Sequence, residues 1–531
     1  MTEPTLTVDV ALRRRAAHDG GAPYVKVEGR WLSASELAGR SGSIAAGLAS
    51  LGVAPGDRVA VILPNCIEMV EVFFACAQLG AVLVPLNAWL KGAFLEHQLI
   101  DSGATVLVAD GSGLEAALPS IDASSVTQVV AVGASPPVLP LPTTRWADLT
   151  KLATPPPVVV RPGDAMAIIY TSGTTGLPKG CVLSHGYYTS TSRAIAERGW
   201  LRPDDRLLTA WPLFHTSGQA IALMSALMIG ATVAFESAFS ASTFIATATA
   251  DSATVIAGVG FMGAAILATP PSAADRDHRV RLAWWVPMPP DQQLAFEERF
   301  GIPVMSEAYG QTECFPVTMA PVGIERNRGT LGPPTEHFEL RLLDDDGNEV
   351  TDGTSGEICV RPRLPHVMYS GYWERPEATL AAWDNLWHHT GDLARRDVDG
   401  SLRFVDRKKD AMRRRGENIS SLELEGAIRR HPAVKDVAVC AAASAMTEDE
   451  IRALIVTEDG AALEPAELFA FFKSSLPYFA IPRYVELVPA LPVNALGRVM
   501  KHAIRDAPVA ADAWDFEALG LAVGRDERRS G

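Results

Sequence analysis

Residues 170–180, YTSGTTGLPKG, combine small hydroxyl side chains, glycines and one lysine. Glycines let backbone N–H groups approach an anion, hydroxyl groups add hydrogen-bond donors, and Lys179 adds a positive charge. Gly180 follows this lysine where a Walker A loop has Ser or Thr, so the segment is not of that type. The pattern predicts a loop that holds phosphate groups, and an ordinary Gly/Ser turn is the alternative.

Five further polar segments follow the glycine-rich one. Each of them alone fits a simple structural explanation, namely a core histidine, a polar surface turn or a solvated charged face. The segments are WPLFHTSG at 211–218, YGQTE at 309–313, WHHTGD at 387–392, DRKKD at 406–410 and RRRGENISS at 413–421.

In this order, within residues 30–505, the six segments resemble the motifs of the ANL superfamily of adenylate-forming enzymes. This superfamily comprises acyl-CoA synthetases, peptide-synthetase adenylation domains and firefly-type luciferases. The resemblance implies an acyl-CoA ligase that joins a carboxylic acid to coenzyme A through acyl-AMP, with ATP or AMP, coenzyme A and Mg²⁺ as cofactors. Residues 283–290 (AWWVPMPP) and 418–425 (NISSLELE) are most similar to the carnitine- and crotonobetaine-CoA ligase branch.

The resemblance implies a nucleotide site made from several motifs. Tyr309 would lie against the adenine and Thr312 on the α-phosphate. Asp392 would accept hydrogen bonds from both ribose hydroxyls, Arg407 would be the second ribose contact, and Lys409 would occupy the hinge between two domains. The implied nucleotide-binding residues are Thr171, Ser172, Gly173, Thr174, Thr175, Gly176, Tyr309, Gly310, Thr312, Asp392, Arg407 and Lys409.

The resemblance also implies the residues of the reaction and of the metal. Glu313 and Thr175 would bind Mg²⁺, and His215 would lie beside the acyl site and the route of coenzyme A. Gly416 would line the pantetheine tunnel, and the three arginines at 413–415 would either meet coenzyme A phosphates or form a solvated face. The implied catalytic residues are Lys179, His215, Thr312, Glu313, Gly416 and Arg498.

One position departs from the family pattern. The family ends an essential late motif with Gly-Lys, and its lysine bridges the substrate carboxylate and the α-phosphate; here Arg498 follows Gly497. Guanidinium is planar and wider than an ammonium group, and losing one well-placed donor costs roughly 10²–10³ in rate. Two expectations stay open. Either Arg498 serves as the cation, or the protein uses acyl-AMP made by a separate adenylating enzyme. Lys501 is not assigned the missing role.

Short β-branched segments alternate with amphipathic ones, which predicts an α/β fold with a largely parallel sheet. We expect a large N-terminal domain of mixed sheets and helices over 1–406, a small mobile α+β domain over 407–515, and a disordered tail over 516–531. An antiparallel appendage is expected at 332–361. Strands are predicted at 58–63, 81–85, 105–109, 127–132, 165–170, 434–441 and 484–487, and helices at 68–79, 422–430 and 465–474.

The net charge, the cysteines and the hydropathy of the chain limit which binding partners and which cellular setting are expected. The net charge of −15 disfavours nucleic acid, because a phosphate backbone would be repelled. The six cysteines form no CxxC pair, which indicates buried thiols in a reducing cytoplasm and not a disulfide framework or zinc site. Residues 216–235 read as a buried helix and strand and not as a membrane span. A homodimer is the commonest assembly of soluble enzymes.

Other functions compete with the ligase. Residues 216–223 lack the acidic residue by which a peptide-synthetase adenylation domain recognises an amino group, and no carrier domain follows. A luciferase-like oxygenase and a non-catalytic binder of acyl-AMP or nucleotide are further alternatives. The acyl pocket should draw on residues 214–222, 257–267 and 306–310, which are mostly apolar and predict an apolar, bulky acid as the substrate.

Overall fold

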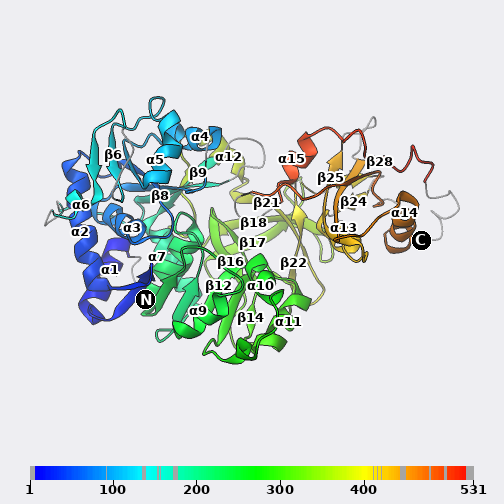
Figure 1. Ribbon diagram of the computed structural model, residues 1–531, viewed down its shortest axis with the longest axis horizontal. Coiled ribbons are helices and arrows are strands. Elements are labelled where there is room, and N and C mark those ends of the chain that lie inside the picture. The colour runs from blue at the N-terminus through cyan, green and yellow to red at the C-terminus, as the bar shows by residue number, and fades with distance from the viewer. Residues whose placement is uncertain are drawn as a thin grey trace. The chain divides into compact units, whose positions relative to one another are not determined.

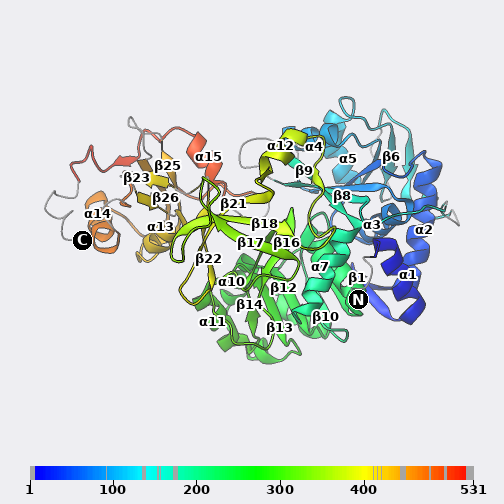
Figure 2. The ribbon, with the colours of Figure 1, turned by 180° about the vertical axis from the view of Figure 1, so that it is seen from behind.

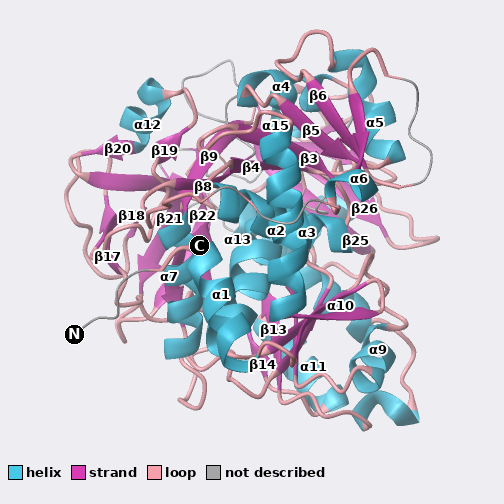
Figure 3. Ribbon diagram, turned by 90° about the vertical axis from the view of Figure 1, so that its left-hand side faces the viewer, coloured by secondary structure: helices cyan, strands magenta, loops and turns pink. Residues whose placement is uncertain are grey.

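The computed structural model describes two units of the chain, which Figures 1 and 2 show from opposite sides and Figure 3 shows by secondary structure. Unit 1 comprises Met1–Leu340 and Val360–His388, and unit 2 comprises Arg341–Cys359 and His389–Gly531. The described residues are 6–90, 92–133, 139–151, 155, 157–171, 178–408, 410, 412–414, 417–419, 421–442, 450–476, 480–494 and 499–521.

Unit 1 contains an eight-stranded sheet in the order β19-β9-β8-β4-β3-β5-β6-β7. Strands β3, β4 and β5 are short apolar segments that are almost wholly buried, as expected for parallel strands covered on both faces. Only β9 and β19 pair antiparallel with their neighbours. The strands are β3 Arg58–Ile62, β4 Val82–Leu86, β5 Val106–Ala109, β6 Gln128–Ala131, β7 Thr143–Arg145, β8 Ala165–Thr171, β9 Lys179–Ser184 and β19 Gly371–Tyr372.

The second large sheet of unit 1 has seven strands in the order β14-β13-β12-β10-β11-β1-β2. All pairs are parallel except β1 with β2, which follow each other directly in the chain. Strand β13 carries Trp284 and Trp285, which are fully buried. The strands are β1 Pro23–Val27, β2 Arg30–Ser33, β10 Arg206–Thr209, β11 Thr232–Phe235, β12 Val255–Val259, β13 Leu282–Val286 and β14 Val304–Met305.

Helices that pack with these sheets begin and end at recognisable signals. Ser33 and Ser184 accept hydrogen bonds from the backbone N–H three residues on and so cap α2 and α7, while Gly80, at φ 69°, ends α3. The helices of unit 1 are α1 Val8–Asp19, α2 Ala34–Ser50, α3 Ile67–Leu79, α4 Ala93–Ser102, α5 Gly111–Ala117, α6 Trp146–Leu149, α7 His185–Glu197, α8 Ser225–Ile229, α9 Phe244–Ala250, α10 Gly260–Leu267, α11 Pro290–Phe300 and α12 Pro376–Ala382, with a π-helix at Ser217–Met224 and 3₁₀ turns at Leu118–Ser120 and Ala273–Arg276.

The division between the units falls within strands of a smaller sheet, whose order is β17-β18-β21-β20 with β22 paired to β21. Its strands are β17 Phe338–Leu343, β18 Ser355–Pro362, β20 Trp383–Asp384, β21 Trp387–Arg396 and β22 Leu402–Arg407. A separate hairpin of β15 Ala308–Gln311 and β16 Cys314–Met319 belongs to unit 1. The predicted appendage at 332–361 therefore supplies two strands, β17 and β18, of a sheet that β20, β21 and β22 complete.

Unit 2 carries a four-stranded sheet in the order β25-β26-β27-β28 beside helices α13, α14 and α15. Its core is an apolar cluster that includes Ile428, Val439, Ile455 and Phe472. The elements are β23 Met412–Arg414, β24 Glu417–Ile419, α13 Ser421–Ile428, β25 Val434–Ala442, β26 Glu450–Thr457, α14 Pro465–Ser475, β27 Tyr484–Leu487, α15 Lys501–Asp506 and β28 Trp514–Asp515.

The α/β fold class with a large and a small part is confirmed, and each predicted strand and helix has a counterpart in the structure. Two details differ. The division of the chain places 341–359 and 389–406 in the second unit, because β18, β21 and β22 pair there. Phe516 is 1% exposed within the core of unit 2, so residues 516–521 belong to the folded unit and not to a disordered tail. Among the described helices, none has the length and hydropathy that a bilayer span needs.

A buried ion pair in unit 2 provides a test of its packing. Arg452 donates to both carboxylate oxygens of Glu486 at 2.7 and 3.0 Å, and to the carbonyl oxygens of Ile504 and Ala507 at 2.8 Å. We predict that Arg452→Met destabilises unit 2 by about 3–5 kcal/mol, because it leaves the Glu486 carboxylate buried and uncompensated. Hydrogen exchange of the β26 and β27 amides measures this.

The matched control is Arg429→Met. Arg429 pairs with Asp436 at 2.9 Å, but both side chains are about half exposed, so its loss should cost only about 0–1 kcal/mol. Equal protection of β26 and β27 in the two variants would contradict the prediction.

Candidate functional site

The glycine-rich loop connects two antiparallel strands of the eight-stranded sheet. Strands β8 and β9 pair so that Thr171 lies opposite Lys179, the last residue pair before the loop. Tyr170 anchors the end of β8, because its hydroxyl donates to Asp101 Oδ2 at 2.8 Å. Pro178 is held from the other side, since its carbonyl oxygen lies 2.8 Å from His97 Nε2. Five predicted loop residues lie outside the described residues: Ser172, Gly173, Thr174, Thr175 and Gly176.

Glu313 lies beside the two ends of this loop. Its carboxylate is buried, with 8% of the residue exposed. Oε1 accepts a hydrogen bond of 2.9 Å from the Tyr372 hydroxyl and lies 3.5 Å from Thr171 Oγ1. The ammonium of Lys179 lies 4.3 Å from the centre of the Tyr372 ring. The structure therefore brings together three residues that the sequence predicted for one site, around a tyrosine that it did not predict.

The β15–β16 hairpin fixes the position of Glu313. Thr312 and Glu313 form its turn, and the ladder has an irregularity between Tyr309 and Gln311. Gly310 is required here because a Cβ atom would lie 2.7 Å from the carbonyl oxygen of Cys314. Tyr309, Gly310 and Thr312 are thus held on the same hairpin as the carboxylate.

The protonation of Tyr372 follows from its surroundings. Burial raises the pKa of the phenol, and the neighbouring Glu313 carboxylate raises it further. The hydroxyl therefore stays protonated in the physiological range and acts as a donor.

This donor set fits a hard cation beside phosphate. Within the described part of the chain, the Glu313 side chain is bonded to hydroxyl groups and forms no ion pair with Lys, Arg or His. A carboxylate oxygen is a preferred ligand of Mg²⁺, and Lys179 adds a positive charge suited to phosphate. Glu313 would hold the cation, with Thr171 and Lys179 next to the phosphates.

His215 lies in a turn that follows β10. Its Nδ1 is 3.2 Å from Ser217 Oγ, where the π-helix begins. Asn65 fixes the turn, because its side chain donates to Trp211 O at 3.0 Å and accepts from Leu213 N at 2.7 Å. The irregular helix and this anchoring hold the histidine at the end of the parallel sheet.

The predicted ribose contacts lie in unit 2, on paired strands. Asp392 on β21 is opposite Arg407 on β22, and Arg407 Nε is 3.6 Å from Asp392 Oδ1. The Asp392 side chain is 7% exposed, whereas that of Arg407 is 43% exposed. The pairing of two strands therefore explains why residues from two separate motifs meet.

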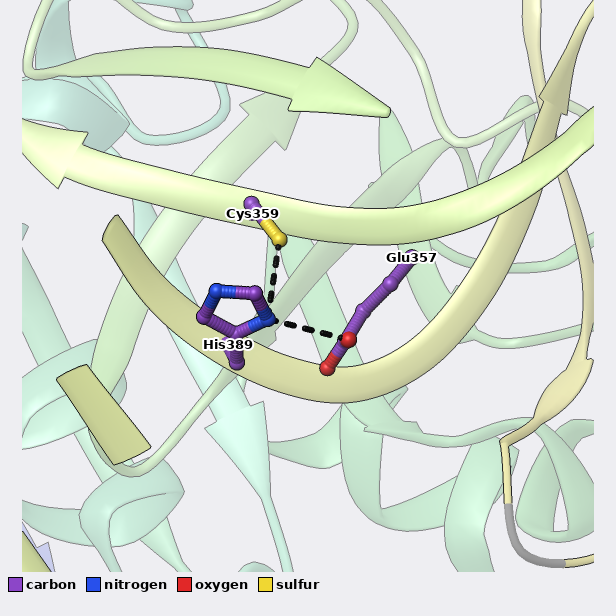
Figure 4. A group of neighbouring side chains, drawn as sticks. All are labelled: Glu357, Cys359 and His389. Atoms are coloured by element: carbon purple, nitrogen blue, oxygen red, sulfur yellow. Dashed lines mark hydrogen bonds and ion pairs between the residues drawn. The ribbon is translucent and has the colours of Figure 1, made fainter. Parts of the chain in front are cut away.

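A buried carboxylate, Glu357, supports the turn that carries Asp392. Figure 4 shows Glu357 beside His389 and Cys359. Glu357 Oε1 accepts from Gly391 N at 2.8 Å, while Oε2 accepts from His389 Nδ1 at 3.0 Å and from Lys408 Nζ at 3.0 Å. Sequence reasoning missed Glu357, because its partners come from β21 and from the residue after β22. The two ends of this carboxylate thus fix both the Asp392 turn and the segment next to Arg407.

Glu357, Cys359 and His389 also have the donor types of a metal site, and their ligand atoms lie within 4.8 Å of one another. However, the Lys408 ammonium lies on the carboxylate oxygen that would bind the metal. Burial raises the pKa of the Cys359 thiol to about 12 in the metal-free protein, and its sulfur lies 3.4 Å from His389 Nδ1. These contacts make the cluster a hydrogen-bonded support for the Asp392 turn.

Two basic residues of unit 2 are already engaged in contacts within that unit. Arg414 is buried, donates to Ile481 O at 2.7 Å and pairs with Glu450 at 2.7 Å. The expectation that all three arginines at 413–415 meet coenzyme A or solvent is thus wrong for Arg414. Lys501 Nζ is 2.8 Å from Glu425 Oε1, which agrees with assigning it no catalytic role. The predicted residues Lys409, Gly416 and Arg498 lie outside the described residues.

Comparisons with known proteins match most of the chain. The family model described as AMP-binding enzyme matches residues 12–373, and the model of the AMP-binding enzyme C-terminal domain matches residues 423–498. A feruloyl-CoA synthase from Amycolatopsis is 34% identical over 496 residues, covering 93% of this chain and 97% of that protein. A crotonobetaine/carnitine–CoA ligase from Salmonella arizonae is 32% identical over 472 residues, covering 86% and 89%.

Solved structures are similar over nearly the full length. The structure of an anthranilate CoA ligase in complex with anthranoyl-AMP has a TM-score of 0.84 and 25% identity, and covers 95% of this chain and 97% of that one. An O-succinylbenzoate coenzyme A synthetase from Bacillus subtilis in complex with AMP has a TM-score of 0.80 and 27% identity, and covers 94% and 98%.

The buried carboxylate of unit 2 gives a prediction with a defined pH dependence. Burial acts to raise the pKa of Glu357, but hydrogen bonds from His389, Lys408 and Gly391 outweigh it and lower the pKa. We predict that Glu357→Gln destabilises unit 2 at pH 7 by about 1–3 kcal/mol. The amide is neutral and has one acceptor oxygen, so it cannot accept from Gly391 N as well as from His389 and Lys408. Urea unfolding monitored by hydrogen exchange of β21 and β22 measures this.

The sign of the pH effect follows from the lowered pKa. Wild-type Glu357 contributes its stabilisation above the unfolded pKa of about 4.3 and loses it as the pH falls through the lower folded value. The difference between wild type and variant should therefore shrink below about pH 4.3. Glu349→Gln is the control, since the nearest nitrogens of Arg341 and Arg396 lie 3.9 Å from its half-exposed carboxylate. A pH-independent difference would contradict the role given to Glu357.

Proposed function

The chain belongs to the family of AMP-binding enzymes, and from that premise we propose that it activates an apolar, bulky carboxylic acid and transfers the acyl group to coenzyme A. It is an acyl-CoA ligase, an acid–thiol ligase that works through an acyl-AMP intermediate, as the sequence resemblance implied. The single observation that carries the proposal is the convergence of Thr171, Lys179 and Glu313 at the end of the β8–β9 pair.

The reaction has two steps in this proposal. In the first, the substrate carboxylate attacks the α-phosphorus of ATP, and pyrophosphate leaves. Lys179 and the loop would hold the phosphates, Thr312 would donate to the α-phosphate, and Asp392 and Arg407 would bind the ribose. Mg²⁺, when bound, neutralises phosphate charge, and Glu313 with Thr175 would hold it.

In the second step, the thiolate of coenzyme A attacks the acyl carbonyl, and AMP leaves. His215 would border the acyl group and the route of the thiol, and Gly416 would leave room for pantetheine. Lys409 would be the hinge at which the small domain turns between the steps. Coenzyme A is the proposed acceptor in preference to a carrier protein, because the most similar relatives include CoA ligases.

The substrate class is inferred from the segments expected to surround the acyl group. Phe214 and Met262 are buried, and Phe261 is 54% exposed. Phe214 packs edge-on against Trp89, with 5.5 Å between ring centres. Such rings favour a flat apolar group over a charged one. Relatives named for feruloyl and anthranoyl groups support an aromatic acid within this class.

We propose that the protein works in the cytoplasm. All six cysteines are free and buried, which supports a reducing, cytoplasmic location. A homodimer is the assembly we propose, as the commonest form of such enzymes.

The first experiment separates the two half-reactions on one purified sample. One reaction contains ferulic, benzoic or anthranilic acid with ATP, Mg²⁺ and coenzyme A, and the other contains the matching synthetic acyl-AMP with coenzyme A. We expect acyl-CoA in both. Product from acyl-AMP alone would indicate a protein limited to thioester formation, supplied by a separate adenylating enzyme. Absence of product from every acid and every acyl-AMP would contradict the ligase proposal.

Arg498 decides between these two outcomes. If the guanidinium is the defect, Arg498→Lys should raise ATP–pyrophosphate exchange by roughly 10²–10³-fold, because the compact ammonium fits between carboxylate and phosphate. Thioester formation from acyl-AMP should not change and is the internal control. Unchanged exchange in the variant of an active ligase would mean that arginine performs the role of the family's lysine.

A further inference from the structure

Tyr372 contacts both charged side chains of the proposed phosphate and metal site. Its hydroxyl donates to Glu313 Oε1 at 2.9 Å. The face of its ring lies 4.3 Å from the Lys179 ammonium. The negative group thus binds the polar end of the tyrosine, and the positive group binds its aromatic face.

The tyrosine itself is held from several directions. Tyr372 on β19 pairs with Cys181 of β9. Cys181 lies two residues from Lys179 on that strand, so the pairing holds the tyrosine close to the lysine. Its backbone N–H donates to Thr379 Oγ1 at 2.9 Å. Tyr369 packs edge-on against its ring, with 5.1 Å between ring centres. The side chain is therefore fixed before any ligand arrives.

Lys179 and Glu313 have opposite charges, and both are among the described residues, yet they form no ion pair with each other there. A direct pair with the buried Glu313 carboxylate would be electrostatically favourable. It would also occupy the ammonium and the carboxylate that phosphate and cation need. In the structure each charge is bonded to a different part of one tyrosine.

We propose that Tyr372 is a positioning residue that keeps Lys179 and Glu313 apart and fixes the Glu313 carboxylate for the cation that accompanies the nucleotide. This inference rests on the proposed function of the site. The hydroxyl orients the carboxylate, and the ring gives the ammonium a place that phosphate can readily compete for. The protein thereby keeps two opposite charges available in one partly buried site.

The test measures how much Mg²⁺ strengthens ATP binding. Isothermal titration gives the Kd of ATP with Mg²⁺ and with EDTA, and the ratio of the two is the Mg²⁺ factor. Tyr372→Phe keeps the ring and removes the hydroxyl, so it should lower the Mg²⁺ factor by about 10-fold, the cost of one hydrogen bond to a charged group, and leave the Kd in EDTA unchanged. Tyr372→Leu should also weaken binding in EDTA by about 2–5-fold, because Lys179 can then pair with Glu313 and phosphate must break that ion pair.

Tyr369→Phe is the matched control. It removes a neighbouring hydroxyl, 3.4 Å from His388 Nδ1, while the backbone N–H of Tyr369 still donates to Glu313 O at 2.9 Å. Its Mg²⁺ factor should equal that of wild type. An unchanged factor in Tyr372→Phe, or an equal loss in Tyr369→Phe, would overturn the role of Tyr372 alone. A wild-type protein without Mg²⁺-dependent ATP binding would overturn the proposed function together with this inference.

Discussion

A buried carboxylate has to be compensated, and much of this structure is arranged around that constraint. An unpaired ionised group inside a protein costs several kcal/mol. Glu313 meets the constraint with the phenol of Tyr372 at 2.9 Å. The donor is neutral, so the negative charge is retained for a ligand. If a Lys or Arg side chain paired with the carboxylate instead, the buried charge would be compensated, but the carboxylate could no longer bind a cation.

The second unit solves the same problem in the opposite way. Glu357 is bonded to a backbone N–H, a histidine and a lysine, which together neutralise it. The result is a rigid turn at Thr390–Asp392 whose purpose is to hold Asp392 and not to bind a ligand directly. The two carboxylates differ in role because their donors differ in charge.

Local chemistry made much of the site predictable from sequence. Thr171 and Lys179 lie in one dense motif, and any hairpin that closes that loop must bring them near each other. The β-branched segments likewise predicted strands such as β3 and β5, because a strand that is almost fully buried needs little context. Resemblance to a family supplied Glu313, Asp392 and Arg407, which no spacing rule would have joined.

Tyr372 and Glu357 could not be predicted in this way. Tyr372 lies on a two-residue strand whose partner, β9, is nearly two hundred residues away in the chain, so nothing local marks it. Glu357 reaches its donors only because β18, β21 and β22 lie in one sheet. Arg414 was misread for the same reason, since three adjacent arginines look alike until the fold buries one of them.

The engagement of Lys501 has a consequence for how this protein can change over generations. Its ammonium compensates Glu425, which is mostly buried. If Lys501 took over the role of the family's lysine at position 498, the Glu425 carboxylate would be left buried without a cation. That loss would cost about 3–5 kcal/mol of stability. Lys501 is therefore not available to replace the family's lysine at position 498. If arginine limits the first half-reaction, the shortest evolutionary route to recover it passes through codon 498 itself.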